Sequence, residues 1–417
     1  MAKKAGFLAL GGHIATQNAS FRTIMEHLGN GWEFFGLENG FEAFKTGNMY
    51  KLSPEVIDPY YAGFYAGATR ANLHKKDDDH PDPQKIEEAI KFMRAARLDY
   101  LIASAGDDHG MQAETLRKAY KSAGLDCKVL VLSKTMDSDK GGKDGTCIYG
   151  YVAPFADTTN GFHTAIKVGT EFINRQYAGS WTNEAVTIVS HFGRDANWVG
   201  LALAWYGNCD RIFPGELPKD HPGHSIDTIA ELTEQSIAKN QREYGRRFAF
   251  IVLPEGTRIS GIEHESNLLE DPHNHRKLNP ELIAVGLKEI LEANYGIKSQ
   301  NVTITYDMRN SPPSDVDLRL AELTGMKIVC AMRQGATGLE AVIKFRAGEA
   351  VAELVPIPLA SEKRLASYYP KPLYNPQTFV PLPEIEHYFL PLFGARIERG
   401  KLLPRKPTVL NVYEGKN

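Results

Sequence analysis

Four carboxylates and one lysine follow two short apolar runs of the chain, at Asp107, Asp108, Lys134, Asp137 and Asp139. Carboxylates that share one site repel one another unless a cation neutralises them, and their oxygen atoms are ligands that suit Mg²⁺. A lysine would oppose the binding of a bare metal ion, but it favours a metal that carries an anion such as phosphate. These residue types therefore predict chemistry on a magnesium-bound phosphate.

The second of these groups, with Lys134, Thr135 and Asp137, contains the parts needed for phosphoryl transfer. A hydroxyl acceptor loses a proton as it attacks phosphorus, and a carboxylate such as Asp137 can take that proton. Lys134 can neutralise charge on the transferring group. An Asx-turn cluster would also explain acids in a loop, but it would not explain the lysine. One of Asp107 and Asp108 could serve only as a helix N-cap.

The apolar runs that precede these groups, 100–103 and 128–132, predict buried strands because they are too short for helices and end at polar residues. Similar runs alternate with helical patterns along the chain, which predicts βαβ units and a mostly parallel sheet. The predicted strands cover residues 6–10, 100–103, 128–132, 185–190, 248–253, 301–305 and 327–330. The predicted helices cover residues 18–28, 83–97, 111–122, 162–176, 198–206, 228–242, 280–294 and 315–323.

Most of the predicted strands end in glycine or in a polar cluster, which predicts one shared ligand site because ligands of open α/β sheets bind beyond the carboxyl ends of the strands. Gly11 and Gly12 follow the first strand, and their amides could hold a phosphate. Arg194 and Arg309 follow later strands and could bind phosphate through the planar guanidinium. Glu255 could accept hydrogen bonds from sugar hydroxyls. Loops after strands are usually polar, so each cluster alone would be weak support.

The composition is that of an ordinary soluble globular protein. The length of 417 residues suggests two or three domains or one large α/β enzyme, and the net charge is -3. This charge gives no general attraction to nucleic acid or to an acidic membrane. No apolar run reaches the ~18 residues of a membrane-spanning helix. The four cysteines have neither metal-ligand spacing nor a disulfide framework, which favours the cytoplasm. His273 and His275 are expected on the surface and not at a metal.

The ordered motifs resemble those of the phosphofructokinase family. That family carries a Gly-Gly-Asp turn and a Thr-Ile-Asp-Asn-Asp loop after successive strands. Asp-x-Thr-x-Gly-Phe, Met-Gly-Arg, Glu-Gly and an arginine-bearing segment follow. Matching segments occur in the same order at residues 105–109, 133–139, 157–165, 192–194, 255–256 and 306–312. The chain departs from the family at His109, where serine is usual, and at Phe192, where methionine is usual. The segment around Arg70 aligns poorly with the family's arginine-bearing loop.

This resemblance implies an α/β fold of two Rossmann-like three-layer αβα domains, with mostly parallel sheets and an active site in the cleft between them. The domain that binds pyrophosphate and Mg²⁺ would comprise residues 1–150 plus roughly 308–375. The sugar-phosphate domain would comprise roughly 151–307 plus the C-terminal segment 376–417. Members of the family are usually oligomeric, so a homodimer or homotetramer is expected.

The resemblance also implies a role for each matching residue. Asp137 would be the catalytic base, with Lys134 and Asp108 beside it, and Asp107 would bind Mg²⁺. Pyrophosphate would contact Gly12, Asp108 and Lys134. The residues that would contact the transferred phosphoryl group or the sugar phosphate are Thr135, Asp137, Gly193, Arg194, Glu255, Tyr306 and Arg309.

Asp108 and Lys134 predict the phosphoryl donor. Members of the family that use ATP have glycine at the position of Asp108 and usually also at the position of Lys134. Members that use pyrophosphate resemble this chain, with Asp and Lys at these positions. The expected reaction is reversible transfer from pyrophosphate to the 1-hydroxyl of fructose 6-phosphate. An ATP-dependent kinase, a pyrophosphate-dependent kinase of sedoheptulose 7-phosphate, and a non-catalytic subunit that senses a phosphometabolite are the alternatives.

Overall fold

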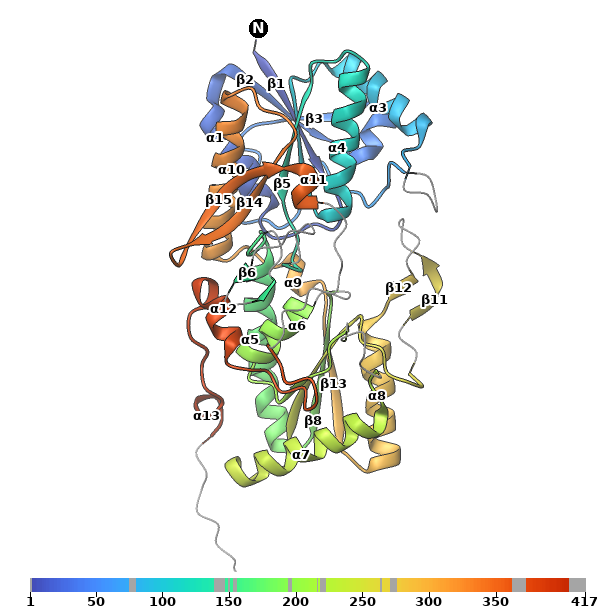
Figure 1. The fold of residues 1–417 in the computed structure, drawn as a ribbon, viewed down its shortest axis with the longest axis vertical. Coiled ribbons are helices and arrows are strands. Elements are labelled where there is room, and N and C mark those ends of the chain that lie inside the picture. Colours follow the sequence, from blue (N-terminus) through green and yellow to red (C-terminus); the bar gives the residue numbers. More distant parts are fainter. Residues whose placement is uncertain are drawn as a thin grey trace, which may run out of the picture.

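The two larger sheets of the described chain lie one above the other in the view of Figure 1, with helices packed against both. The computed structural model describes residues 2–74, 80–138, 147–148, 151–152, 156–193, 197–215, 217, 223–262, 265–270, 276–361 and 373–404. The predicted α/β class with mostly parallel sheets and alternating helices is confirmed.

The first sheet has seven strands in the order β15-β14-β5-β4-β1-β2-β3. Its inner strands run parallel, and the edge strands β3 and β15 are antiparallel to their neighbours. Every residue of β4 is buried, as expected for a parallel strand that is covered on both faces. The strands are β1 (Lys3–Ala9), β2 (Trp32–Leu37), β3 (Met49–Leu52), β4 (Tyr100–Ala105), β5 (Lys128–Ser133), β14 (Leu339–Arg346) and β15 (Glu349–Pro356).

Helices cover both faces of this sheet because successive side chains of its strands point to opposite sides. Ile102 of β4 packs in the same cluster as Phe21 of α1 (Gln17–Leu28) and Ile328 of α10 (Asp315–Arg333). The preceding residue, Leu101, packs instead with Met93 and Tyr120, which belong to α3 (Pro83–Ala96) and α4 (Asp107–Ser122). Short helices at this end are η1 (Gly29–Gly31), η2 (Gly40–Glu42), α2 (Ala43–Thr46) and α11 (Ile357–Ser361).

The second sheet is entirely parallel, in the order β13-β8-β10-β9. Helices α5 and α6 contact each other, as do α7 and α8, and each pair packs on the sheet. The strands are β8 (Val186–His191), β9 (Arg211–Ile212), β10 (Ala249–Pro254) and β13 (Ser299–Ile304). The helices are α5 (Phe162–Asn183), α6 (Asn197–Tyr206), α7 (Ile226–Tyr244), α8 (Pro280–Tyr295) and the short α9 (Asp307–Asn310).

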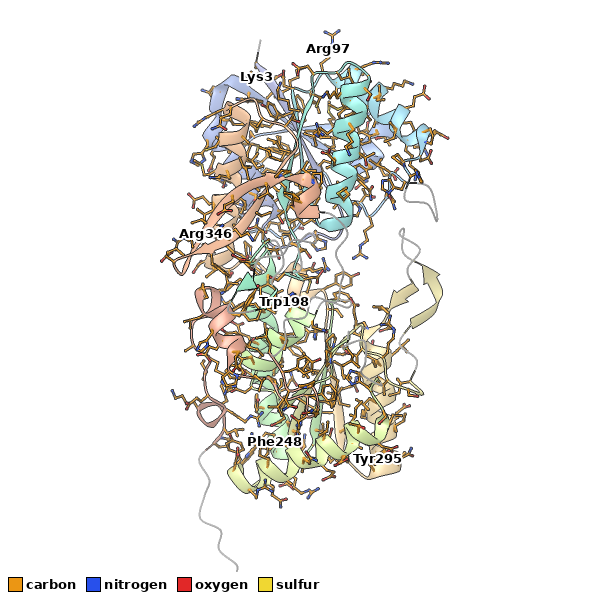
Figure 2. All side chains as sticks on the ribbon, viewed as in Figure 1. Lys3, Arg97, Trp198, Phe248, Tyr295 and Arg346 are labelled. Carbon is orange, nitrogen blue, oxygen red and sulfur yellow. The ribbon has the colours of Figure 1, made fainter. Side chains whose placement is uncertain are left out.

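The C-terminal helices α12 (Glu384–Phe393) and α13 (Arg399–Leu402) return to the second sheet. Trp198 of α6 stacks on Tyr388 of α12 with ring centroids 4.8 Å apart, and it lies near the middle of the molecule in Figure 2. Two small antiparallel hairpins complete the described chain, β6 (Cys147–Ile148) with β7 (Tyr151–Val152) and β11 (Glu265–Glu270) with β12 (Arg276–Leu278). No helix in the described ranges is both long and apolar enough to cross a membrane.

The two helices α5 and α10 are joined by a buried carboxylate. Asp317 of α10 accepts hydrogen bonds from the backbone amides of Gly161 and Thr164, at 3.0 and 2.7 Å, and from the Thr164 hydroxyl at 2.5 Å. These amides belong to the first turn of α5, where the helix has no internal partner for them. Asp317 therefore attaches the start of α5 to a helix of the first sheet.

One predicted strand, 327–330, is wrong because these residues lie inside α10. The run is apolar and partly β-branched, which favours a strand locally. In the structure it continues the buried face of α10, on which Leu320, Thr324 and Ile328 follow one another at helical spacing. Packing of this face against α1 and the first sheet outweighs the local preference.

The sequence analysis also missed the hairpin formed by β14 and β15. Its two strands do not alternate strictly between polar and apolar residues, so neither shows the regular pattern of a half-buried strand. The turn between them carries Ala347 and Gly348, with φ of 51° and 83°. Two consecutive positive φ angles are typical of the tight turn that matches the twist of paired strands.

Candidate functional site

The loops that follow β1 and β5 meet at the carboxyl edge of the first sheet. The Lys134 side chain is 5% exposed, and its ammonium donates a hydrogen bond to the carbonyl oxygen of Gly12. A Cβ atom built on Gly12 would lie 2.6 Å from Nη1 of Arg309 and 3.4 Å from Nη2 of Arg70. Glycine at this position therefore lets two guanidinium groups approach the backbone closely.

The Asp137 carboxylate is oriented by Thr135 of the same loop. The Thr135 hydroxyl donates to Oδ2 of Asp137 at 3.0 Å, and it accepts from the Asp137 amide at 3.1 Å. The other carboxylate oxygen, Oδ1, is buried and has no hydrogen-bond partner among the described residues. Such an oxygen is available to accept a proton or a hydrogen bond from a ligand.

The segment before α5 fixes the loop that carries Lys134 and Asp137. The side-chain amide of Asn160 donates to the carbonyl oxygen of Ser133 at 3.1 Å, and the Thr159 hydroxyl donates to that of Thr135. Both anchoring residues precede the helix whose first turn is capped by Asp317. The position of the Asp137 carboxylate thus depends on contacts between the ends of both sheets.

Arg309, in the short helix after β13, reaches across to the first sheet. Its Nη1 donates to the carbonyl oxygen of His13 at 3.5 Å, and its guanidinium carbon lies 5.8 Å from the ring centroid of Phe192. The ring of Tyr306 packs edge-on against the same phenyl ring, at 5.2 Å. Nε of Arg309 is buried and has no hydrogen-bond partner within the described part of the chain. A guanidinium with an unused donor is suited to binding an anion.

Gly193 and Glu255 hold the turn after β8. The Gly193 amide donates to Oε1 of Glu255 at 3.1 Å, and the Glu255 amide donates to the carbonyl oxygen of His191 at 3.0 Å. Glu255 is 8% exposed. The buried carboxylate therefore positions the backbone of the turn, and its contact with a sugar remains a prediction.

His191, at the end of β8, was not selected by the sequence analysis. Burial lowers the pKa of its imidazole to about 4, while the Phe192 carbonyl oxygen and the charge of Asp137 act in the opposite direction. Its ring is therefore neutral near pH 7. The charge of Asp137, in the loop after β5, thus acts on a residue at the end of β8 in the other sheet.

Several predicted site residues lie outside what the structure describes. Arg194 and Asp139 are outside the described residues, as are His273 and His275. For Asp107 and Asp108 only the backbone is described, and it opens α4 directly after Gly106. The magnesium role of Asp107 and the donor role of Asp108 therefore remain predictions. The described side chains contain no group of three or more His, Cys, Asp or Glu residues that could hold a metal ion.

Arg70 is the basic residue that the sequence analysis could not place. It follows Thr69, whose carbonyl oxygen accepts a hydrogen bond from the Gly11 amide at 2.7 Å. That contact brings the irregular segment after β3 to the loop of Gly11 and Gly12, which we call the glycine loop. A single arginine in a segment without regular structure gives no signal in the sequence, because only the folded backbone brings it near Gly12.

Comparisons with known proteins place these residues in one family. A family model described as Phosphofructokinase matches residues 4–332. The pyrophosphate--fructose 6-phosphate 1-phosphotransferase of Dictyoglomus thermophilum is 26% identical over 361 residues, which cover 85% of this chain and 91% of the relative. The ATP-dependent 6-phosphofructokinase of Spirochaeta thermophila is also 26% identical, over 369 residues, which cover 86% of this chain and 91% of the relative.

The fold is likewise shared with solved structures. The crystal structure of pyrophosphate-dependent phosphofructokinase from Marinobacter aquaeolei matches with a TM-score of 0.73 at 18% sequence identity, and the match covers 97% of this chain and 95% of that one. A second pyrophosphate-dependent phosphofructokinase, from Nitrosospira multiformis, matches with a TM-score of 0.74 at 15% identity, over 99% of this chain and 100% of that one. At these identities the likeness establishes the fold alone.

Proposed function

This chain belongs to the phosphofructokinase family, and we propose that it transfers a phosphoryl group from pyrophosphate to the 1-hydroxyl of fructose 6-phosphate, giving fructose 1,6-bisphosphate and phosphate. The observation that carries this proposal is the Asp137 carboxylate. One of its oxygens is held by Thr135, and the other is buried without a hydrogen-bond partner among the described residues. An oriented carboxylate with a free oxygen can remove the proton of the attacking hydroxyl.

Basic side chains near Gly12 would supply positive charge for the transferring phosphoryl group. Lys134 and Arg70 lie beside Gly12, and Arg309 lies between this loop and Phe192. Phosphoryl transfer depends on positioning and on neutralisation of the charge on phosphate oxygens, and no covalent enzyme intermediate is needed. Thr135 would contact the transferred group, while Gly193, Arg194, Glu255 and Tyr306 would contact the sugar phosphate.

Magnesium would supply charge neutralisation when it is bound, with Asp107 as the proposed ligand. Mg²⁺ keeps several waters and commonly binds through one or two carboxylates plus phosphate oxygens. Asp107 stands at the start of α4, next to the loop that contains Lys134, since β4 and β5 are neighbours in the sheet. A site of this kind needs no cluster of three protein ligands. The donor set of carboxylate and phosphate oxygens fits this ion.

Pyrophosphate is favoured over ATP by Asp108 and Lys134. A carboxylate at position 108 would repel the α-phosphate of ATP, whereas pyrophosphate has no third phosphate to be repelled. The buried Lys134 ammonium offers charge to the phosphate that is released. Relatives named for each donor share similar identity with this chain, so overall likeness does not distinguish the donors and the proposal rests on these two residues.

The test compares the two donors with purified protein, fructose 6-phosphate and magnesium, and measures fructose 1,6-bisphosphate by an aldolase-coupled assay. Formation with pyrophosphate, and little with ATP, is the expected result. An Asp137→Asn variant should give at least about 10²-fold less product and so controls for contaminating enzymes. Activity with ATP alone would overturn the assignment of pyrophosphate as the donor. Activity only after sedoheptulose 7-phosphate replaces fructose 6-phosphate would change the acceptor, and binding without turnover of any pair would favour a phosphometabolite-sensing subunit.

A further inference from the structure

His13, which directly follows the glycine loop, is hydrogen-bonded to the short helix that carries Arg309. Nε2 of His13 donates to Oδ1 of Asn310 at 2.5 Å, and the two residues are 297 positions apart in the sequence. Because an amide oxygen only accepts, the proton of this bond belongs to the imidazole. The bond connects the loop after β1, in the first sheet, to α9, which follows β13 of the second sheet.

The backbone of His13 makes a second contact with the same helix. Its carbonyl oxygen accepts from Nη1 of Arg309 at 3.5 Å, so one residue of the first sheet's loop contacts two consecutive residues of α9. A single contact would leave the helix free to rotate about it, whereas two contacts also fix the rotation. His13 therefore defines how Arg309 is placed relative to the glycine loop.

Helix α9 depends on contacts of this kind for its orientation. It has only four residues, and the amides of Arg309 and Asn310 both donate to the carbonyl oxygen of Tyr306, at 2.9 and 2.7 Å. Met308, which is 1% exposed, packs in the core of the second sheet. A helix of one turn gains little stability from its own hydrogen bonds. An arginine has many rotamers, and ordering it when a ligand binds lowers the affinity.

We propose that His13 and Asn310 are positioning residues for the sugar phosphate, because their hydrogen bond fixes α9 in the orientation in which Arg309 contacts the phosphate of fructose 6-phosphate. This assignment rests on the proposed function and deepens it. His13 is half-buried and Asn310 is exposed, so water can replace the bond and its contribution to folding is small. Its main consequence is the placement of the guanidinium before the sugar binds.

The test is a double-mutant cycle on the Kd of fructose 6-phosphate, measured by calorimetry with His13→Ala, Asn310→Ala and the double variant. Each single variant should raise the Kd about three- to tenfold, because Arg309 must then be ordered during binding. The double variant should raise it no further, since both substitutions remove the same bond. His13→Gln keeps a side-chain N–H donor and should recover most of the affinity. His387→Ala, at an exposed position of α12, is the matched control and should leave the Kd unchanged.

Two further measurements separate positioning from a structural role. The urea midpoints of all variants should equal that of the wild type, and KM for pyrophosphate should change less than KM for the sugar. An unchanged sugar Kd in both single variants would overturn the assignment, as would additive effects in the double variant. A weaker Kd accompanied by a lower urea midpoint would make the pair structural, and a rise in the pyrophosphate KM alone would move His13 to the donor site.

Failure of the proposed function gives a different result, because it is seen in the wild type before any substitution is made. A wild-type protein that does not bind fructose 6-phosphate would remove the acceptor and, with it, the role of His13 and Asn310. A wild type that binds the sugar with the same Kd as both alanine variants would leave the proposed function standing and overturn this inference alone.

Discussion

The side-chain ammonium of Lys134 donates a hydrogen bond to the backbone carbonyl oxygen of Gly12 and so joins two loops that are 122 residues apart in the sequence. These loops follow β5 and β1, which are separated by β4 in the first sheet. The loop of Lys134 and the loop of Gly12 therefore meet at the carboxyl edge of the first sheet, where ligands of α/β sheets bind.

Replacement of Asp137 tests the proposed base. Asp137→Asn keeps the shape of the side chain but cannot accept a proton in the same way, so kcat should fall by about 10²- to 10⁴-fold. The Kd of fructose 6-phosphate, measured by calorimetry, should change little. Asp126→Asn is the control, because the Asp126 side chain is 96% exposed on the surface. A loss of turnover that only matches a loss of sugar binding would make Asp137 a structural residue.

Arg309 should bind the sugar phosphate through its planar guanidinium. Arg309→Lys keeps the charge but loses the fork geometry, so the Kd of fructose 6-phosphate should rise about tenfold. Steady-state kinetics should show a similar rise in KM for the sugar and a smaller change in KM for the donor. Arg319→Lys, at a position 68% exposed, should leave both unchanged. If the donor KM alone rises, Arg309 belongs to the donor site instead.

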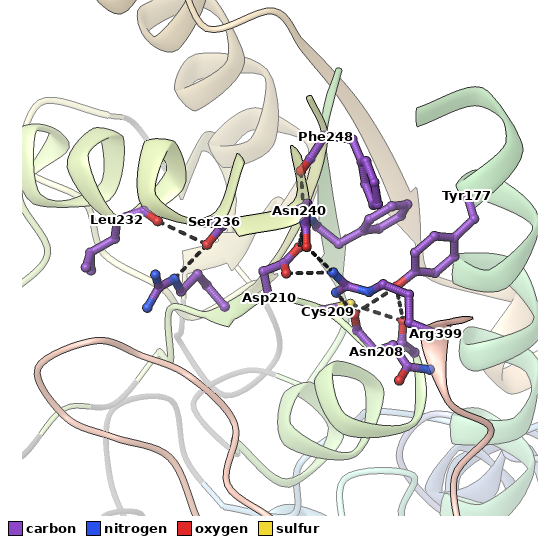
Figure 3. Close-up of polar contacts among 12 residues, drawn as sticks. Tyr177, Asn208, Cys209, Asp210, Leu232, Ser236, Asn240, Phe248 and Arg399 are labelled. Atoms are coloured by element: carbon purple, nitrogen blue, oxygen red, sulfur yellow. Dashed lines mark hydrogen bonds and ion pairs between the residues drawn. The ribbon is translucent and has the colours of Figure 1, made fainter. Parts of the chain in front are cut away.

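A buried arginine anchors the C-terminal segment far from this site (Figure 3). Arg399 donates from Nη1 to Oδ1 of Asp210 and to Oδ1 of Asn240, both at 2.8 Å, and from Nη2 to the carbonyl oxygen of Asn208. Asp210 also accepts hydrogen bonds from Asn240 and from the Phe250 amide. These contacts attach α13 to α7 and to the second sheet.

Arg399→Met should lower the free energy of unfolding by about 3–5 kcal/mol, because Asp210 would remain buried without its cation. Urea unfolding followed by circular dichroism measures this change. The matched control is Arg319→Met, since Arg319 forms an exposed pair with Glu349 at 3.5 Å and should contribute less than ~1 kcal/mol. Equal effects of the two substitutions would show that burial of the Arg399 pair does not matter for stability.

Stability should decrease in mild acid because of His163 and His191. Burial lowers the pKa of each imidazole to about 4, with the charge of Lys167 adding to the effect at His163. In the unfolded chain the pKa is about 6.5, so the unfolded state binds protons first as the pH falls. The stabilisation is therefore complete above pH ~6.5 and is lost progressively toward pH ~4, by up to about 1.4 kcal/mol per pH unit for each ring.

The measurement is the free energy of urea unfolding between pH 7.5 and pH 4.5, in wild type and in His163→Gln. The variant should lose about half of the histidine contribution and show a shallower slope. His387→Gln, at an exposed position of α12, should keep the wild-type slope. A His163→Gln slope equal to wild type would mean that this ring titrates normally in the folded protein.

Local patterns were sufficient to predict most of the fold. The strands that became β1, β4, β5, β8, β10 and β13 were predicted because short apolar runs ended at glycine or charge. Residues 327–330 were predicted wrongly because a β-branched run looks the same in a buried helix as in a strand. The hairpin of β14 and β15 needed tertiary context, since β14 pairs with β5 across a long sequence separation.

The residues of the candidate site that belong to the ordered motifs could be predicted from the sequence. Those outside the motifs could not. Lys134, Thr135 and Asp137 come from one loop, so their proximity follows from sequence alone. Arg70 reaches Gly12 only because Thr69 bonds to Gly11 in the folded chain. His191 follows the predicted strand 185–190, and its electrostatic interaction with Asp137 depends on how the two sheets meet.

The most direct test of the central claim compares donor preference in wild type and in the double variant Asp108→Gly/Lys134→Gly. The quantity is the ratio of kcat/KM for pyrophosphate to kcat/KM for ATP, with fructose 6-phosphate and magnesium held at saturation. We predict a ratio far above one in the wild type and a fall of at least about 10²-fold in the double variant, as charge complementarity to pyrophosphate is lost. A wild-type ratio below one, or a double variant that still prefers pyrophosphate, would contradict the account.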